Sequence, residues 1–193
     1  TQVPQTFTVL AKALTITAVV TPPSIAFGAA TPTNSFTPSG LINSDSVTSL
    51  TYTYTNNGGT TYNSTTAPTA VGNYFVTPSA ALGTGLAKYS ISYVAGSLSI
   101  GLASQSIAIT STPTTPTYGA TYTIAATGGG SGNLVTFSSA TLSVCTLSGS
   151  VVTFVGIGTC TINADQLGNS SYSAATQVPQ TFTVLAKALT ITA

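Results

Sequence analysis

TQVPQTFTVLAKALTITA, residues 1–18 of this 193-residue chain, returns without a single change as residues 176–193. The offset between the two copies is 176 − 1 = 175 residues, and an identity of this length does not arise by chance. Self-similarity at a fixed period is the sequence signature of a repeat protein. The chain therefore contains a little more than one period of a longer array, and we expect its two ends to be cuts across that array.

The residues in and between the two copies follow the pattern of β-strands. Short alternating runs rich in Val, Ile, Thr, Tyr and Phe, such as TFTVL at 181–185, are separated by Gly, Pro, Asn and Ser. An alternation of period two turns one face of a strand toward a core and the other, here mostly Thr and Ser, toward water. Helical periodicity is limited to one possible turn over residues 39–47. The predicted fold class is all-β, with two small β domains in tandem.

The domain boundaries follow from the strand spacing. Residues 11–101 hold irregularly spaced strands and end in YSISYVAGSLSI at 89–100, which predicts a hairpin with Gly96 in its turn. Residues 102–185 hold a more regular series of seven strands. Residues 1–10 are then the last strand of a preceding domain, and residues 186–193 the first strand of a following one. Because the junctions are short, we expect little bending between neighbours.

The repeated strand is the first candidate site. Its residues are Thr6, Phe7, Thr8 and Val9 in the first copy and Thr181, Phe182, Thr183 and Val184 in the second. The first copy has no domain to complete within its own chain, so we expect it either to hang free or to pair with another copy. An unpaired strand beside an open sheet edge is a template for strand addition.

Longer stretches of both domains resemble known families. In the second domain these are SQSIAITSTP at 104–113, TYTIAATGG at 121–129 and SVCTLSGSVVTFVGIGTCTINADQLGNSSY at 143–172, followed by VPQTFTV at 178–184. They resemble a family of bacterial surface immunoglobulin-like repeats. In the first domain they are KALTITA at 12–18, IAFG at 25–28, SGLINSDSV at 39–47, VGNYFVTP at 71–78 and KYSISYVAGSLSI at 88–100. They resemble MBG-type domains of large bacterial adhesins and filamentous-haemagglutinin-like exoproteins, with Phe27 where the family usually has Tyr before Gly28.

Together the two resemblances imply a fold and a setting. The first domain would be an MBG-type, mostly-β domain, and the second an immunoglobulin-like seven-strand sandwich. The pair would form a repeat in the stalk of a giant bacterial protein, secreted or attached to the cell surface. Its partners would be adjacent repeats of the same protein, with identical chains in a filament as a further candidate.

Cys145 and Cys160 are a candidate disulfide. They lie on strand-like segments separated by the strand at 151–155, and strands one apart in sequence order can face each other across a sandwich core. An even number of Cys in a repeat that resembles secreted modules favours an oxidising compartment. A reduced pair in the core is the alternative. A metal pair would lack ligands, because the chain has no His and no third Cys.

Composition argues against most chemistry. Charged residues make up 3% of the chain, against about a quarter in a typical soluble protein. Without Glu, the carboxylates are Asp45 and Asp165, one in each domain, so no glycosidase pair or calcium loop is expected. A Ser or Thr nucleophile would need Lys12, Lys88 or Lys187 as its base. We therefore expect that the protein is not an enzyme and that it has no cofactor or metal site. Asp165 is expected to have a structural role, capping the turn ADQLGN at 164–169.

Charge and hydropathy also limit the classes of partner that the chain can have. A net charge of +1 supplies no electrostatic attraction for nucleic acid. No run of 18 apolar residues occurs, so no membrane-spanning helix is predicted.

Three alternatives to a purely mechanical stalk stay open. Lys12 or Lys88 could form an amide crosslink with an Asn or Asp, although ordinary solvent-facing lysines are the preferred interpretation. Rows of Thr, or the tyrosines, could bind glycans or ice, since aromatic faces stack on sugars; a flat Thr array or a Tyr-lined groove would favour this. These tyrosines are Tyr52, Tyr54, Tyr62, Tyr74, Tyr89 and Tyr93. Finally, separate chains could polymerise by strand exchange at the repeated end.

Overall fold

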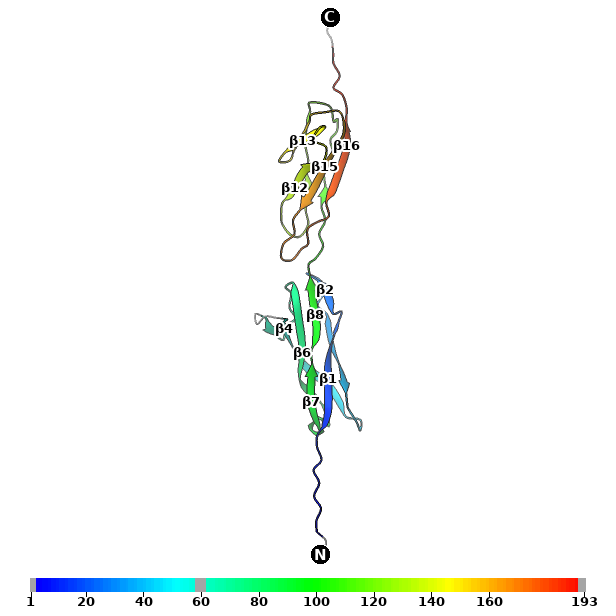
Figure 1. Ribbon diagram of the computed structural model, residues 1–193, viewed down its shortest axis with the longest axis vertical. Helices are drawn as coiled ribbons and strands as arrows, with labels where there is room; N and C mark the ends of the chain where they lie inside the picture. Colours follow the sequence, from blue (N-terminus) through cyan, green and yellow to red (C-terminus); the bar gives the residue numbers. More distant parts are fainter. Residues whose placement is uncertain (1–2, 58–61, 191–193) are drawn as a thin grey trace. The chain divides into compact units, whose positions relative to one another are not determined.

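The computed structural model describes residues 3–57 and 62–190 (Figure 1). In sequence the chain divides into two compact units, with the boundary after Gly101. Apart from one 3₁₀ turn at Leu86–Lys88, the regular structure of the described residues is β, which confirms the all-β prediction. No helix in the described residues is long and apolar enough to cross a membrane.

Unit 1 is built from two sheets. One has the strand order β3-β1-β7 and the other the order β2-β8-β6-β4-β5. The strands are β1 (Lys12–Thr21), β2 (Ser24–Ala26), β3 (Thr33–Ser39), β4 (Ser46–Asn56), β5 (Asn63–Ser64), β6 (Gly72–Thr84), β7 (Tyr89–Val94) and β8 (Gly96–Gly101). Within the first sheet, β1 lies antiparallel to β3 and parallel to β7.

The core of unit 1 follows from strand alternation. Leu14, Ile16, Ala18 and Val20, every second residue of β1, are buried. The buried residues of unit 1 form two clusters, one of which contains Leu14, Ile16 and Tyr89. The other cluster contains Val20, Tyr54, Tyr74, Val76, Leu98 and Ile100. Both β1 and β6 thus bury one face, while the other face, which includes Val19 and Phe75, is more exposed.

The predicted hairpin at residues 89–100 is wrong. β7 and β8 follow each other directly but pair with different partners, β7 with β1 and β8 with β6 and β2. The chain therefore passes from one sheet to the other at this point. Gly96 permits the crossing through close approach: a Cβ there would lie 2.9 Å from the carbonyl oxygen of Ala18.

The predicted helical turn at residues 39–47 is also wrong. Asn43 and Ser44 have φ values of 55° and 60°, in the left-handed region. The backbone N–H of Asp45 donates to the carbonyl oxygen of Ile42 at 3.0 Å. Two successive residues with positive φ close a tight turn of the kind that joins antiparallel strands, not a helix.

Unit 2 has three hydrogen-bonded groups of strands, with the orders β10-β14-β13, β11-β9 and β12-β15-β16. The strands are β9 (Ala108–Ile109), β10 (Thr121–Thr123), β11 (Ala126–Thr127), β12 (Val135–Ser139), β13 (Cys145–Ser148), β14 (Val151–Phe154), β15 (Gly158–Gln166) and β16 (Val178–Val184).

The connections of unit 2 confirm the predicted immunoglobulin-like sandwich of seven strands. β10 and β11 are two parts of one strand, which is interrupted at Ile124 and Ala125. The backbone hydrogen bonds of these two residues continue the pairing of the strand with β14 on one side and with β9 on the other. The sheets then have the orders A-B-E-D and C-F-G of a constant-type immunoglobulin domain. Side chains of both sheets meet in one core, which contains Ile124, Cys145, Val152, Phe154, Cys160, Ile162 and Val184.

Candidate functional site

The second copy of the repeated stretch supplies the last strand of unit 2. Residues 178–184 form β16, which pairs antiparallel with β15 over its whole length (Figure 1). Val184 is 1% exposed. The ring of Phe182 meets those of Phe154 and Tyr122 edge to face, with centroids 5.6 and 6.0 Å apart. β16 therefore closes one side of the core.

The end of the strand is tied to a different part of the unit. Leu185 forms a parallel bridge with Thr117. Its N–H donates to the carbonyl oxygen of Pro116 at 2.8 Å, and its carbonyl oxygen accepts from the N–H of Tyr118 at 2.9 Å. Halfway along the strand, the Nε2 of Gln180 donates to the carbonyl oxygen of Ser111 at 2.6 Å. Neither Leu185 nor Gln180 was among the predicted site residues, although both lie inside the identical stretch.

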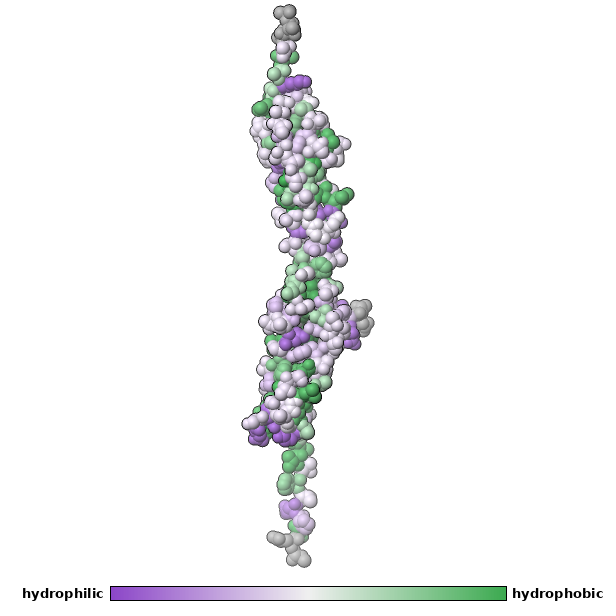
Figure 2. All heavy atoms as spheres, turned by 180° about the vertical axis from the view of Figure 1, so that it is seen from behind, coloured by the Kyte–Doolittle hydropathy of each residue, from purple (hydrophilic) through white to green (hydrophobic). Residues whose placement is uncertain are grey.

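The first copy has the same side chains in a different environment. Residues 3–11 belong to no strand, so Thr6, Phe7, Thr8 and Val9 make no strand here, although their counterparts do. Phe7 is 87% exposed and Val9 82% exposed. Figure 2 shows hydrophobic residues along the segment that precedes β1. Residues 1–2 lie outside the described part of the chain.

Very little sequence separates the bonded ends of the units. β8 ends at Gly101, and Ala103 already bridges to Tyr172 in unit 2, which leaves Leu102 between them. At the other end Leu185 is bonded within unit 2, and the counterpart of Lys187 is Lys12, where β1 begins. Here residues 186–190 form no strand, and residues 191–193 are outside the described part.

Cys145 and Cys160 form a disulfide that joins the two sheets of unit 2. It connects β13 with β15, with a Cα–Cα distance of 5.7 Å and a sequence separation of 15 residues. Both Cys are fully buried, and reduced thiols, the alternative from the sequence, are not observed. Closing a loop of this length contributes about 3 kcal/mol to stability by restricting the unfolded chain.

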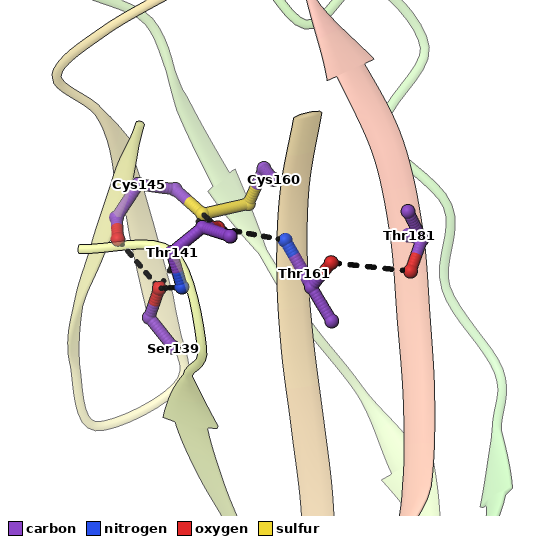
Figure 3. Close-up of a disulfide and its surroundings, with 6 residues drawn as sticks. All are labelled: Ser139, Thr141, Cys145, Cys160, Thr161 and Thr181. Atoms are coloured by element: carbon purple, nitrogen blue, oxygen red, sulfur yellow. Dashed lines mark hydrogen bonds between the residues drawn. A yellow bond between two sulfur atoms is a disulfide. The ribbon is translucent and has the colours of Figure 1, made fainter. Parts of the chain in front are cut away.

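Hydroxyl groups hold the loop beside the disulfide in place (Figure 3). The Oγ of Ser139 donates to the carbonyl oxygen of Cys145 at 2.7 Å. The N–H of Thr161 donates to the Oγ1 of Thr141 at 2.9 Å. On the outer face of β15, the Oγ1 of Thr161 lies 3.3 Å from that of Thr181 on β16. Covalent and hydrogen bonds thus connect the disulfide, β15 and β16 to one another.

A charged cluster lies in unit 1. The Nζ of Lys88 lies 2.9 Å from the Oδ2 of Asp45, and the hydroxyl of Tyr89 donates to the same carboxylate at 2.9 Å. The Asp45 side chain is 9% exposed and that of Lys88 61%. The ammonium of Lys88, with a smaller contribution from Tyr89, lowers the pKa of Asp45 despite the opposing effect of burial. The hydrogen bond to Asp45 raises the pKa of Lys88.

The direction of these pKa shifts bears on the amide crosslink considered from the sequence. Amide formation needs a neutral amine and an uncharged carboxyl group, and the two shifts favour the ammonium and the carboxylate instead. The pair is therefore best described as an ion pair. Lys12 forms no ion pair among the described residues.

The other acidic residue is used structurally. Asp165 accepts two hydrogen bonds from the Nε2 of Gln177, at 2.9 and 3.0 Å. The expectation that Asp165 caps the turn at 164–169 is wrong: the Oδ1 of Asn169 does the local capping, accepting from the N–H groups of Ser171 and Tyr172 at 2.8 and 2.9 Å. The described residues include no group of three potential metal ligands.

Most of the tyrosines considered for sugar stacking pack in the core of unit 1: Tyr52 and Tyr62 are partly buried against it, and Tyr93 is 36% exposed. Tyr54, Tyr74 and Tyr89 are buried in the core of unit 1, and Tyr62 stacks edge to face on Tyr74 at 5.8 Å. A small Thr array does exist: on β15 and β16, Thr159 faces Thr183 and Thr161 faces Thr181.

No curated protein matches the chain. Among solved structures, the fibronectin(III)-like modules of Clostridium thermocellum CbhA align over 88% of this chain and 94% of theirs, with 15% identity and a TM-score of 0.36. A C-terminal 282-residue fragment of intimin, solved with the intimin-binding domain of the translocated intimin receptor, aligns over 87% of this chain and 62% of its own length, with 16% identity and a TM-score of 0.28. At these scores neither likeness carries an argument about function.

Unit 1 matches the model of a sequence family. Phe27 and Gly28 follow β2, where the N–H of Ala29 donates to the carbonyl oxygen of Ala26 at 3.1 Å and Gly28 has a φ of 78°. This conformation strongly favours Gly in the third position of a turn. The MBG domain family, of the YGX type, matches residues 14–99 of the chain.

Proposed function

We propose that the 175-residue period is a structural unit of a tandem array that forms an extended extracellular stalk or filament of a bacterial surface or secreted protein. The observation that carries this proposal is the repeated stretch: one copy closes unit 2, and its continuation has the sequence that begins β1 of unit 1. The MBG match and the disulfide support an extracellular setting.

Three features suit a mechanical role. Single residues, Leu102 and Ala186, separate the bonded ends of successive units, and a joint this short limits bending. The disulfide between Cys145 and Cys160 ties the two sheets of unit 2 together. The face shown in Figure 2 is mostly pale, with few strongly hydrophilic residues. Charged residues make up only 3% of the chain, so salt has few charges to screen.

Proteins with one, two and four consecutive periods test this proposal. Strands of eight to ten residues at ~3.3 Å per residue give each unit a length of about 30 Å, so each period should add roughly 60–70 Å. We expect the maximum dimension from small-angle X-ray scattering to rise linearly with the number of periods. Growth with the square root of that number, as for freely jointed domains, would contradict a stalk.

A second candidate function is adhesion through an uncharged hydroxyl surface, with glycans or ice as the target. It rests on the Thr array formed by Thr159, Thr161, Thr181 and Thr183. If the array binds, Thr161→Ala with Thr181→Ala should abolish retention on a glycan array or on ice. Thr37→Ala, on the outer face of β3 in unit 1, is the matched control. A wild-type chain retained on neither surface would remove this candidate.

A further inference from the structure

We infer that residues 3–10 are a closing strand for unit 2 of a second copy of this chain, docking on β15 in the register that β16 uses. The inference rests on the proposed repeat architecture. In a continuous array the second copy would be the preceding period. Between separate chains, the same strand could replace β16 and link the chains end to end.

Sequence identity makes residues 3–10 chemically equivalent to residues 178–185. Counting back 175 positions from the observed pairing of β15 with β16, Val9 would lie opposite Gly158, Phe7 opposite Cys160 and Val3 opposite Ala164. Every backbone and side-chain group that β16 uses is present again in the first copy. The acceptor therefore cannot distinguish the two strands by their side chains.

Two polar contacts of β16 would be reproduced as well. Gln5 corresponds to Gln180, whose side chain donates to the carbonyl oxygen of Ser111 and accepts from the hydroxyl of Tyr122. Thr6 corresponds to Thr181, whose hydroxyl lies beside that of Thr161. These side-chain contacts define one register, because a slip of one residue would turn Phe7 and Val9 to the wrong face.

The exposure of the first copy provides the driving force. The large apolar side chains Val3, Phe7, Val9 and Leu10 are each more than four-fifths exposed, and docking would bury at least two of them as it buries Phe182 and Val184. In the wild-type chain β16 already occupies this place. Its covalent attachment gives it a high effective concentration, so a strand from another chain competes poorly.

Matched substitutions in the full chain can reverse that competition. In the Phe182→Asp, Val184→Asp variant, β16 loses its core contacts while residues 3–10 stay intact. We expect light scattering to show masses of two or more chains that grow with concentration and return to monomer on dilution. The same changes in the first copy, Phe7→Asp with Val9→Asp, should leave a monomer. The variant with all four changes should also be monomeric.

A synthetic peptide, TQVPQTFTVLA, identifies the strand directly. Added to the Phe182→Asp, Val184→Asp chain, it should dissolve the assemblies while β15 keeps its hydrogen-exchange protection, because the peptide takes the place of the docked strand. The peptide carrying Phe7→Asp and Val9→Asp should leave the assemblies intact. A monomeric Phe182→Asp, Val184→Asp chain, or equal association of the four-change variant, would overturn the inference. Linear growth of the multi-period proteins in scattering is independent of this result, so failure of the stalk and failure of strand docking are distinguishable.

Discussion

Val9 and Val184 occupy the same place in identical 18-residue stretches, yet Val9 is 82% exposed and Val184 only 1%. The difference comes entirely from tertiary context, because the local sequence is the same on both sides of each residue. Val184 has β15 beside it and the core of unit 2 beneath it. Local propensity alone is therefore insufficient to form this strand, as expected for β-structure.

Truncating these two residues should affect stability to very different extents. Val184→Ala removes the equivalent of two buried methylene groups at about 0.8 kcal/mol each and leaves a small cavity, so unit 2 should lose about 2 kcal/mol. Val9→Ala should change stability by less than about 0.5 kcal/mol. Hydrogen exchange read by mass spectrometry measures the loss in peptides of unit 2. Equal effects of the two substitutions would show that β16 is not the closing strand.

Reduction of the disulfide should lengthen unit 2 under force. With Cys145 and Cys160 joined, the 15-residue loop between them does not extend when the unit unfolds. Reduction releases this loop, which at ~3.5 Å per residue adds about 50 Å of contour length. Single-molecule force spectroscopy with and without reductant measures the increment. Unit 1 contains no Cys, so its own unfolding step should keep its length and serves as the internal control.

The sequence was sufficient to predict the elements whose pattern is local. Alternation in residues 181–185 predicts a strand where β16 lies, and two Cys on strand-like segments one apart in sequence order predict the disulfide. It failed where a residue's role depends on distant partners. The sequence pattern predicts a hairpin turn at Gly96, but the φ of Gly96 is not positive, and glycine is needed there because β1 passes close by. Asn43 and Ser44 close a left-handed turn in a stretch whose polar residues were equally compatible with one helical turn.

The crossing at Gly96 can be tested by adding one methyl group. In Gly96→Ala the new Cβ would lie 2.9 Å from the carbonyl oxygen of Ala18 and 3.3 Å from a methyl group of Val20. We expect the backbone to shift and unit 1 to lose about 1–3 kcal/mol, as for other overpacked sites. Gly101→Ala is the control, because its nearest neighbour would be 3.9 Å away. Chemical denaturation of both variants measures the difference, and a Gly96→Ala chain as stable as the control would refute a close crossing.

The acid sensitivity of unit 1 should depend on Asp45. It is the only carboxylate side chain in that unit, since the chain has two acidic residues and the other is Asp165 in unit 2. Its pKa is lowered from 3.8 in the folded state, chiefly by Lys88. A lowered pKa means that the folded state releases the proton more readily than the unfolded state does. The resulting stability is fully present above about pH 4 and is lost as the pH falls through the folded value.

Asp45→Asn should remove this dependence. The variant should be less stable than wild type at pH 7, because the ion pair is absent, and its stability should stay nearly constant from about pH 5 down to about pH 2. Lys88→Gln should lower stability at pH 7 by a similar amount, and the double variant should lose little more, since both changes break one interaction. Hydrogen exchange of β4 and β7 against pH measures these effects, with Asp165→Asn as the control. An Asp45→Asn chain in which unit 1 keeps the wild-type loss of stability below pH 4 would show that other groups carry it.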